Sequence, residues 1–404
     1  MMRLGSGRLV VSLGIASVYF LITCEILFMI LPFAVYFYSV YGPVLEFLSS
    51  HPLTGWSTEF FLPHMVFTKD PLIVGISYLQ VLFIVGMLMF LISAIPLYYT
   101  RIFKKTIARR GPYSRIRHPQ YLSLAIAGFG LLLYWPRFII LVSYVTMLFV
   151  YYLLARNEEW RMAKRFGPSY EEYMRNTPMF IPGEPGGRLY RRFLGRIGPK
   201  WLGITLVYVV ALSLSLGIAY GLREYSSTHI QKISAGEVTI IPVFSRPDAE
   251  VLSLYQAVTD RAEVRGLLTE GVNLVYLMPG DFFLSALLIE EPRKFSDELI
   301  ARFPEILEWH RYKFGGTVGR FFRIFYNYLQ ALGAANEGYE VERLIFVAVK
   351  DGRGNTVGPD SVFGIGLERT AVALVDIDAT SHELLVEKKL SGLHKWGKIP
   401  MPVF

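Results

Sequence analysis

The sequence has almost no cysteine and comparatively little charge. A single cysteine, Cys24, occurs in 404 residues, so an intrachain disulfide and a thiolate zinc cluster are both excluded. Charged residues make up 18% of the chain and hydrophobic residues 53%, whereas an average soluble protein is about 25% charged. This composition argues against a single water-soluble fold and predicts a membrane protein.

Five stretches are almost free of charge and long enough to cross a bilayer. A spanning helix needs about 20 apolar residues, because it rises about 1.5 Å per residue across a hydrocarbon layer of about 30 Å. The first stretch carries one charge, Glu25, and is about twice as long as a signal-peptide core, so we expect it to be retained as an anchor. We predict a polytopic α-helical membrane protein with about five transmembrane helices, over residues 9–38, 71–100, 119–136, 138–155 and 201–222.

Lys and Arg are distributed unevenly among the connecting segments. Residues 101–117 hold seven of them and no acid, whereas residues 39–70 hold only Lys69. Because short loops rich in Lys and Arg stay in the cytoplasm, we expect segment 101–117 and the amino terminus to be cytoplasmic. Everything after residue 222 is then extracytoplasmic. This asymmetry suits a bacterial inner membrane.

The charge balance changes sign along the chain. Residues 1–222 hold 21 Lys and Arg against 9 Asp and Glu, whereas residues 223–404 hold 20 against 24. The shift predicts a domain boundary. We expect a membrane domain at 1–200, with a cytosolic helix at 156–176 and a linker at 177–200, then the fifth helix at 201–222. Topology and anionic lipid account for the basic excess of the first part, so no nucleic-acid partner is inferred.

Residues 223–404 show mixed periodicity, and about 180 residues are enough for an independent core. We predict an extracytoplasmic α+β domain, with a possible envelope protein as its partner. Helices are expected at 249–268 and 317–335, and strands at 238–244, 273–278, 344–350, 361–367, 370–376 and 383–389.

One motif with chemical potential opens the third predicted span. Pro119 favours the first position of a helix and keeps His118 out of helical geometry. The positive end of that helix, with Arg117 and His118 beside it and Tyr121 on its first turn, suits a carboxylate or a phosphate. The alternative is that Arg117 and His118 only mark the membrane boundary and reach toward lipid headgroups.

Two adjacent acids, Glu158 and Glu159, follow where the fourth predicted span leaves the bilayer. Neighbouring side chains on a helix point in different directions, so one carboxylate can face the bundle while the other faces the cytosol. Ordinary solvated charge is the alternative interpretation.

Together the two motifs resemble the isoprenylcysteine carboxyl methyltransferases and related phospholipid methyltransferases, over residues of about 100–182. The family pattern is Gly-Pro-Tyr, Arg-His-Pro-x-Tyr entering a membrane hairpin, Glu-Glu, Phe-Gly, two tyrosines three apart and a closing Ile-Pro. The matching residues are Gly111 to Tyr113, Arg117 to Tyr121, Glu158, Glu159, Phe166, Gly167, Tyr170, Tyr173, Ile181 and Pro182. Two positions depart from it: Ser123 where glycine is frequent, and Met179 where a basic residue is frequent.

The resemblance implies an S-adenosylmethionine-dependent methyltransferase acting on a lipophilic or lipid acceptor at the cytosolic membrane face. It implies that Arg117, His118 and Tyr121 hold the methionyl part of the cofactor. Glu158 and Glu159 would then meet its ammonium, ribose or adenine amine. The acceptor atom stays open among a carboxylate, a phospholipid amine and a thiol.

Two other functions remain open from the sequence. A membrane reductase that uses NADPH is the first, because sterol reductases resemble the same helical fold. The second is a membrane-anchored envelope binding module with a degenerate enzyme domain. Glu25 is a further candidate catalytic residue, since an acid within a spanning segment is costly and often functional. A protonated or hydrogen-bonded acid at a helix interface is its alternative.

Overall fold

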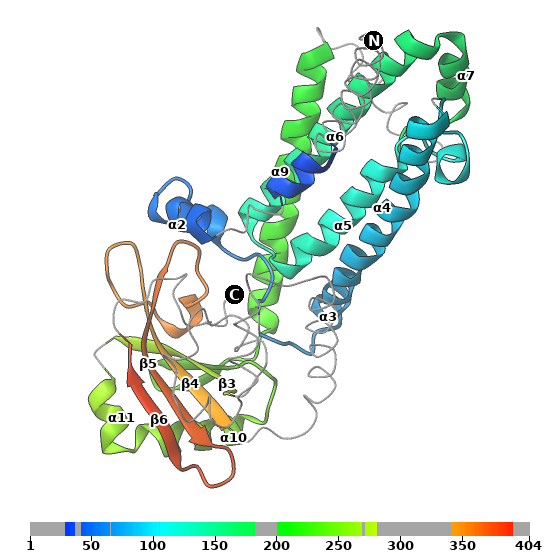
Figure 1. Cartoon of the computed structure of the whole chain (residues 1–404). Helices are drawn as coiled ribbons and strands as arrows, with labels where there is room; N and C mark the ends of the chain where they lie inside the picture. The colour runs from blue at the N-terminus through cyan, green and yellow to red at the C-terminus, as the bar shows by residue number, and fades with distance from the viewer. Residues whose placement is uncertain are drawn as a thin grey trace, which may run out of the picture. The chain divides into compact units, whose positions relative to one another are not determined.

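The structure, a computed structural model, describes residues 29–36, 42–64, 66–104, 106–181, 200–268, 271–280 and 341–390 (Figure 1). The chain divides into two compact units. The first comprises residues 1–48 and 75–221, and the second comprises residues 49–74 and 222–404.

Long apolar helices make up most of the described part of the first unit. Two of them, at residues 71–78 and 200–229, cross the boundaries between the units in the sequence. Helix α3 (Pro71–Tyr78) continues through the 3-10 turn η2 (Leu79–Val81) into α4 (Leu82–Tyr99), which ends in the π-helical turn η3 (Thr100–Lys104). After the 3-10 turn η4 (Gly111–Ser114) come α5 (Pro119–Tyr134), α6 (Phe138–Phe166), α7 (Pro168–Asn176) and α9 (Lys200–His229).

Three helices of the described residues are long and apolar enough to cross a membrane: Pro71–Phe103, Phe138–Phe166 and Trp201–His229. Helix α5 is a shorter apolar helix. These helices lie where four of the five spans were predicted. Of the first predicted span, residues 29–36 are helical, and the remainder, with Cys24 and Glu25, lies outside the described residues.

Helices α4 and α5 cross at glycines. A Cβ atom added at Gly86 would lie 2.3 Å from the backbone nitrogen of Ala127, and one added at Gly130 would lie 2.1 Å from the backbone nitrogen of Phe83. Only a residue without a side chain allows such an approach. The hydroxyl of Tyr36 also donates to the Gly128 carbonyl at 2.7 Å. These contacts hold α5, and with it the motif at its start.

The predicted helix at 156–176 is in fact two helices. Helix α6 ends at Phe166, because Gly167 has a positive φ of 55° and Pro168 follows it. A φ in this region favours glycine, and proline begins the next helix without losing a needed N–H group. Helix α7 therefore starts in a new direction after Gly167.

The second unit contains a six-stranded sheet with strands in sequence order. Its described members are β1 (Ile233–Ala235), β2 (Val238–Pro242), β3 (Val272–Pro279), β4 (Val341–Lys350), β5 (Glu368–Asp378) and β6 (Leu384–Lys389). Strands β2 and β3 pair in parallel, with Ile240 opposite Val275, and every other neighbouring pair is antiparallel. A parallel pair needs a crossover connection, which helices α10 (Asp248–Thr259) and α11 (Ala262–Leu267) supply.

Both faces of this sheet are buried. On one face, Ile240, Val275 and Phe346 pack against Val251 of α10 and Val264 of α11. On the other, residues of β3 and β4 pack against Val66, Ile230 and Phe363, among others. Alternate residues of a strand point to opposite faces, so strands buried on both sides read as continuous apolar runs.

The predicted α+β content of this region is confirmed by the sheet, with two differences in detail. Residues 361–367 were predicted to form a strand but follow the short 3-10 turn η6 (Pro359–Ser361) as turns, since Gly364 and Gly366 interrupt them. The predicted helix at 249–268 breaks at Asp260 into α10 and α11. The helix predicted at 317–335 lies outside the described residues.

Residues 49–74 belong to the second unit although they precede most of the membrane helices. This stretch includes the end of helix α2 (Gly42–Ser50) and the 3-10 turn η1 (Gly55–Thr58). Glu59 is 1% exposed, and its Oε2 lies 3.8 Å from Arg223 and 3.4 Å from Arg369, which are also buried. A buried carboxylate between two arginines ties this segment to α9 and β5.

Candidate functional site

In the first unit the two sequence motifs come together at the start of α5. The backbone N–H groups of Arg117 and His118 donate to the carbonyls of Pro178 and Met179, at 2.9 Å and 3.1 Å. The chain before α5 is therefore paired with the chain after α7. Helix α6 brings Glu158 and Glu159 to the same place, about forty residues further along the sequence than His118.

Arg117 is the main structural tie of this cluster. Its Nε donates to Oε1 of Glu159 at 2.6 Å, and one terminal nitrogen donates to the carbonyls of Met174, at 2.8 Å, and Thr177. The side chains of Arg117 and Glu159 are only 9% and 10% exposed. A planar guanidinium can make these bonds in different directions at once, which a lysine cannot.

His118 lies between the two acids. Its Nε2 is 3.2 Å from Oε1 of Glu159, and its Nδ1 is 3.7 Å from Oε2 of Glu158. The ring is buried, at 2% residue exposure, and Nδ1 has no hydrogen-bond partner. The distance to Glu158 exceeds a hydrogen bond, so Nδ1 is available to a further polar group.

Aromatic rings close the apolar side of the cluster. Tyr121 stacks on His118 with ring centroids 5.6 Å apart, and on Tyr151 of α6 with centroids 4.9 Å apart. Phe180 lies 5.8 Å from the His118 ring. Polar groups surrounded by apolar walls interact more strongly than groups in water.

Two tyrosines beside the cluster hold the loop and α7 in place. The Tyr173 hydroxyl donates to the Tyr113 carbonyl at 2.6 Å, and the Tyr113 hydroxyl donates to Oε1 of Gln120 at 3.0 Å. Arg109 donates to the carbonyl and hydroxyl of Ser169 at 2.6 Å and 2.7 Å. Burial raises the pKa of Tyr173 to about 12, so its hydroxyl stays a donor at neutral pH.

All five residues predicted for the cofactor therefore lie in one cluster: Arg117, His118, Tyr121, Glu158 and Glu159. Adjacent acids on a helix can point in different directions, and here Glu159 lies within hydrogen-bond distance of Nε2 of His118, while Glu158 lies 3.7 Å from Nδ1. Glu25 lies outside the described residues.

Sequence reasoning did not identify several polar residues of this cluster. Gln120 is 2% exposed within an apolar helix, and a polar residue in such a place is a usable signal. The carbonyls of Met174 and Thr177 leave no sequence signal at all. The two departures from the family pattern are accommodated: the Ser123 hydroxyl bonds the Pro119 carbonyl at 2.8 Å, and Met179 contributes its carbonyl.

The charge of the cluster favours a ligand with an excess of positive charge. The cluster holds two carboxylates, of which Arg117 pairs with Glu159, and the histidine adds a positive charge only when it is protonated. Arg117 and the amino-terminal end of α5 also offer donors for a negative group. A ligand with both cationic groups and a carboxylate fits this set of residues. Among the described residues, no group of three His, Cys, Asp or Glu could hold a metal ion.

Comparison with known proteins assigns the region that carries the cluster. Residues 72–169 match the model of the phospholipid methyltransferase family. The match covers α4, α5 and α6, including all five cluster residues, and ends before Tyr170 and Tyr173. Neither the curated proteins nor the solved structures contain a match to the chain.

Proposed function

Starting from a membrane methyltransferase domain of the phospholipid methyltransferase family at residues 72–169, we propose that the chain transfers a methyl group from S-adenosylmethionine to a lipophilic acceptor. The convergence of Arg117 and His118 on Glu159, with Glu158 beside the His118 ring, carries this proposal. The acceptor classes are a carboxylate, a phospholipid amine and a thiol.

The residues present fit the proposed cofactor. S-adenosylmethionine supplies an electrophilic methyl group on a sulfonium, and it also carries an ammonium and a carboxylate. Glu158 is the more exposed of the two acids, with 19% of its side chain exposed, and its ion contact among the described residues, with His118, is long at 3.7 Å. We propose that Glu158 binds the ammonium or a hydroxyl of the cofactor, while the unpartnered Nδ1 of His118 bonds a neighbouring polar group.

Arg117 and Glu159 have a positioning role in this proposal as well as a binding one. Their mutual bond, with the bonds of Arg117 to Met174 and Thr177, already occupies several donors and acceptors. The pair would hold the floor of the site in one arrangement, with Tyr121 as an apolar wall. Fixed geometry of this kind is how a transferase aligns two reactants, since alignment alone contributes several kcal/mol to a barrier reduction, roughly 7–11 at best.

The chain's own groups also suit a water-poor reaction. Burial of His118, Tyr121 and Glu159 keeps solvent from the cluster. A carboxylate acceptor then needs no general base, because it attacks as the anion. A phospholipid amine must instead be neutral to attack, which requires a base or a desolvated site.

The first experiment is calorimetric titration of the detergent-purified full-length protein with S-adenosylhomocysteine. We expect micromolar binding that is lost in His118→Ala and in Glu159→Ala. Glu172→Gln, which changes an exposed acid of α7, serves as the matched control and should bind as wild type does. Folded wild-type protein that binds NADPH and not S-adenosylhomocysteine would support the reductase alternative instead.

The cytosolic location of the site is a second part of the proposal, supported by the seven basic residues of segment 101–117. It is tested in a Cys24→Ser background by single cysteines at the exposed positions Ser114 and Arg353. A membrane-impermeant maleimide should label Arg353→Cys in intact cells and Ser114→Cys only after lysis. The reverse pattern would place the site on the other face.

A further inference from the structure

A cleft of about 390 Å³ opens in the second unit, beside the ends of two apolar helices. Asp70 directly precedes Pro71, where one candidate span begins, and His229 is the last residue of another. Both residues line the cleft, together with Lys69, Ser245 and others. This cleft is separate from the cluster around His118, which belongs to the first unit.

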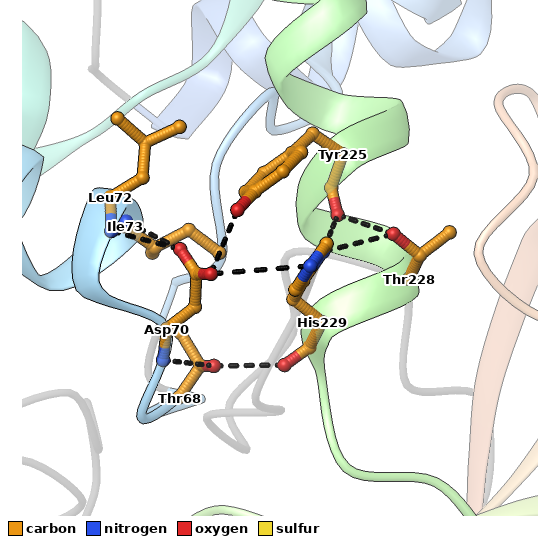
Figure 2. A network of polar contacts seen from close by, with 7 residues as sticks. All are labelled: Thr68, Asp70, Leu72, Ile73, Tyr225, Thr228 and His229. Atoms are coloured by element: carbon orange, nitrogen blue, oxygen red, sulfur yellow. Dashed lines mark hydrogen bonds and ion pairs between the residues drawn. The ribbon is translucent and has the colours of Figure 1, made fainter.

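Asp70 is fully engaged in holding the cleft together (Figure 2). Its Oδ1 accepts from the backbone N–H groups of Leu72 and Ile73, both at 3.0 Å, and its Oδ2 accepts from the Tyr225 hydroxyl at 2.8 Å. The N–H group of Ile73, followed by the Tyr225 hydroxyl, holds the pKa of Asp70 below its usual value. Its charge is therefore satisfied by the protein and does not need a cation from outside.

His229 is fixed in place by the same network. Its ring stacks on Tyr225 with centroids 4.1 Å apart, and Nδ1 lies 2.8 Å from the Tyr225 carbonyl and 3.0 Å from Oγ1 of Thr228 (Figure 2). Nδ1 is then the donor to the carbonyl. Nε2 is 4.0 Å from Oδ2 of Asp70, which exceeds a hydrogen bond. In the protonated ring Nε2 also carries a hydrogen, which it can donate to another acceptor.

Lys69 contributes the available positive charge. Its side chain is exposed, and among the described residues the structure gives it no ion pair. Arg246, the other lining cation, is already bound to Glu342 at 2.7 Å and Glu250 at 3.4 Å. Gln231 braces this wall by donating to the Arg246 carbonyl at 2.6 Å.

The helices are long enough for their ends to reach the headgroup layer or extend beyond it. The span Pro71–Phe103 has 33 residues and Trp201–His229 has 29, so at about 1.5 Å per residue they extend roughly 50 Å and 44 Å. The hydrocarbon layer is about 30 Å thick and the whole bilayer about 40–45 Å. The ends of both helices therefore extend into or past the headgroup layer.

We propose that this cleft binds a phosphate group, with Lys69 and His229 as its main ligands and the Ser245 hydroxyl as a further donor. The phosphate is that of a lipid headgroup or a free phosphate, which share this chemistry. Such a site would tie the second unit to its lipid surroundings, independently of methyl transfer.

The test uses the full-length protein in detergent and follows binding by calorimetry. The probes are dihexanoyl phosphatidic acid, dihexanoyl phosphatidylglycerol and inorganic phosphate, each titrated into wild type, Lys69→Glu and His229→Gln. Lys350→Glu is the matched control, because it makes the same charge change at an exposed lysine outside the cleft. Binding of S-adenosylhomocysteine, measured in parallel, reports on the other site.

We expect Lys69→Glu to weaken phosphate binding by about tenfold or more, the factor expected for loss of one charge-assisted hydrogen bond, and His229→Gln to weaken it less. Lys350→Glu should match wild type. Binding of the lipids alone identifies a headgroup site, and equal binding of inorganic phosphate identifies a free-phosphate site; both support the proposal. It is overturned if no probe binds, or if binding persists unchanged in Lys69→Glu. Neither result depends on S-adenosylhomocysteine binding.

Discussion

Replacing Arg117 by lysine should loosen the loop beneath the candidate site while keeping its charge. The guanidinium makes three bonds, to Glu159, to the Met174 carbonyl and to the Thr177 carbonyl. A lysine nitrogen can keep the ion pair with Glu159 but cannot reach both carbonyls as well. Each of these two part-buried carbonyls left without a donor costs about 1–3 kcal/mol, so losing both donors should lower the free energy of unfolding by about 2–6 kcal/mol.

Two measurements follow this loss. The thermal midpoint of the full-length protein should fall by roughly 5–15 °C. Hydrogen exchange should also be at least about tenfold faster at the amides of Arg117 and His118, which donate to Pro178 and Met179 in the structure. Exchange resolves this local effect from a general loss of stability.

Arg175→Lys is the matched control, because Arg175 is exposed on α7. Substitutions at such surface positions usually change stability by about 0.5 kcal/mol or less. If Arg117→Lys had the midpoint and the exchange rates of Arg175→Lys, the bonds of Arg117 to the carbonyls would not hold this loop, and our reasoning on the site would fail.

Three further perturbations test the packing of each unit. Gly130→Ala should destabilise the chain by about 1–3 kcal/mol in thermal unfolding, because the added methyl group overpacks against α4. Gly75→Ala is the control, since nothing lies within 4 Å of a Cβ atom there, and it should be neutral or slightly stabilising. Equal effects of the two substitutions would contradict the close crossing of α4 and α5. Because burial raises the pKa of Tyr173 to about 12, from 10.0 in the unfolded chain, the unfolded chain ionises first and stability should fall as pH rises from about 10 to 12. Tyr173→Phe should flatten this fall in a pH series of melts, and an unchanged slope would argue against burial. Asp376→Ala should lower the free energy of unfolding by about 3–5 kcal/mol, because it leaves Arg343 buried without its two bonds of 2.7 Å and 2.8 Å. The double change Arg343→Met with Asp376→Leu should cost less in denaturant unfolding, since it leaves no buried charge. A larger loss of stability in the double variant than in Asp376→Ala would refute the pairing.

Much of the fold could be predicted because its signals are local. An uncharged run of twenty residues has few soluble alternatives, and the strands around Ile240, Val275 and Phe346 show the continuous apolar pattern of a sheet buried on both faces. Pro119 likewise marks the start of α5 by its own stereochemistry.

The features that were missed depend on residues far apart in the chain. The bond of Arg117 to Glu159 spans 42 positions, and its bonds to carbonyls leave no trace in side-chain type. The break after Phe166 was readable from Gly167 and Pro168, but the surrounding charge pattern favoured one continuous helix. Residues 361–367 have the composition of a strand, but Gly364 and Gly366 allow turns there instead.

The buried group of Glu59, Arg223 and Arg369 has a consequence for biosynthesis. Glu59 is made early, but Arg369 emerges from the ribosome 310 residues later, after the apolar helices between them. Until then the carboxylate lacks a partner that the finished second unit supplies, and contacts this distant in sequence form late. The sheet-containing unit therefore matures only after Arg369 has been synthesised. A fragment that begins at residue 222 would keep both arginines and lack their acid, so we expect it to fold poorly unless residues 49–74 are supplied.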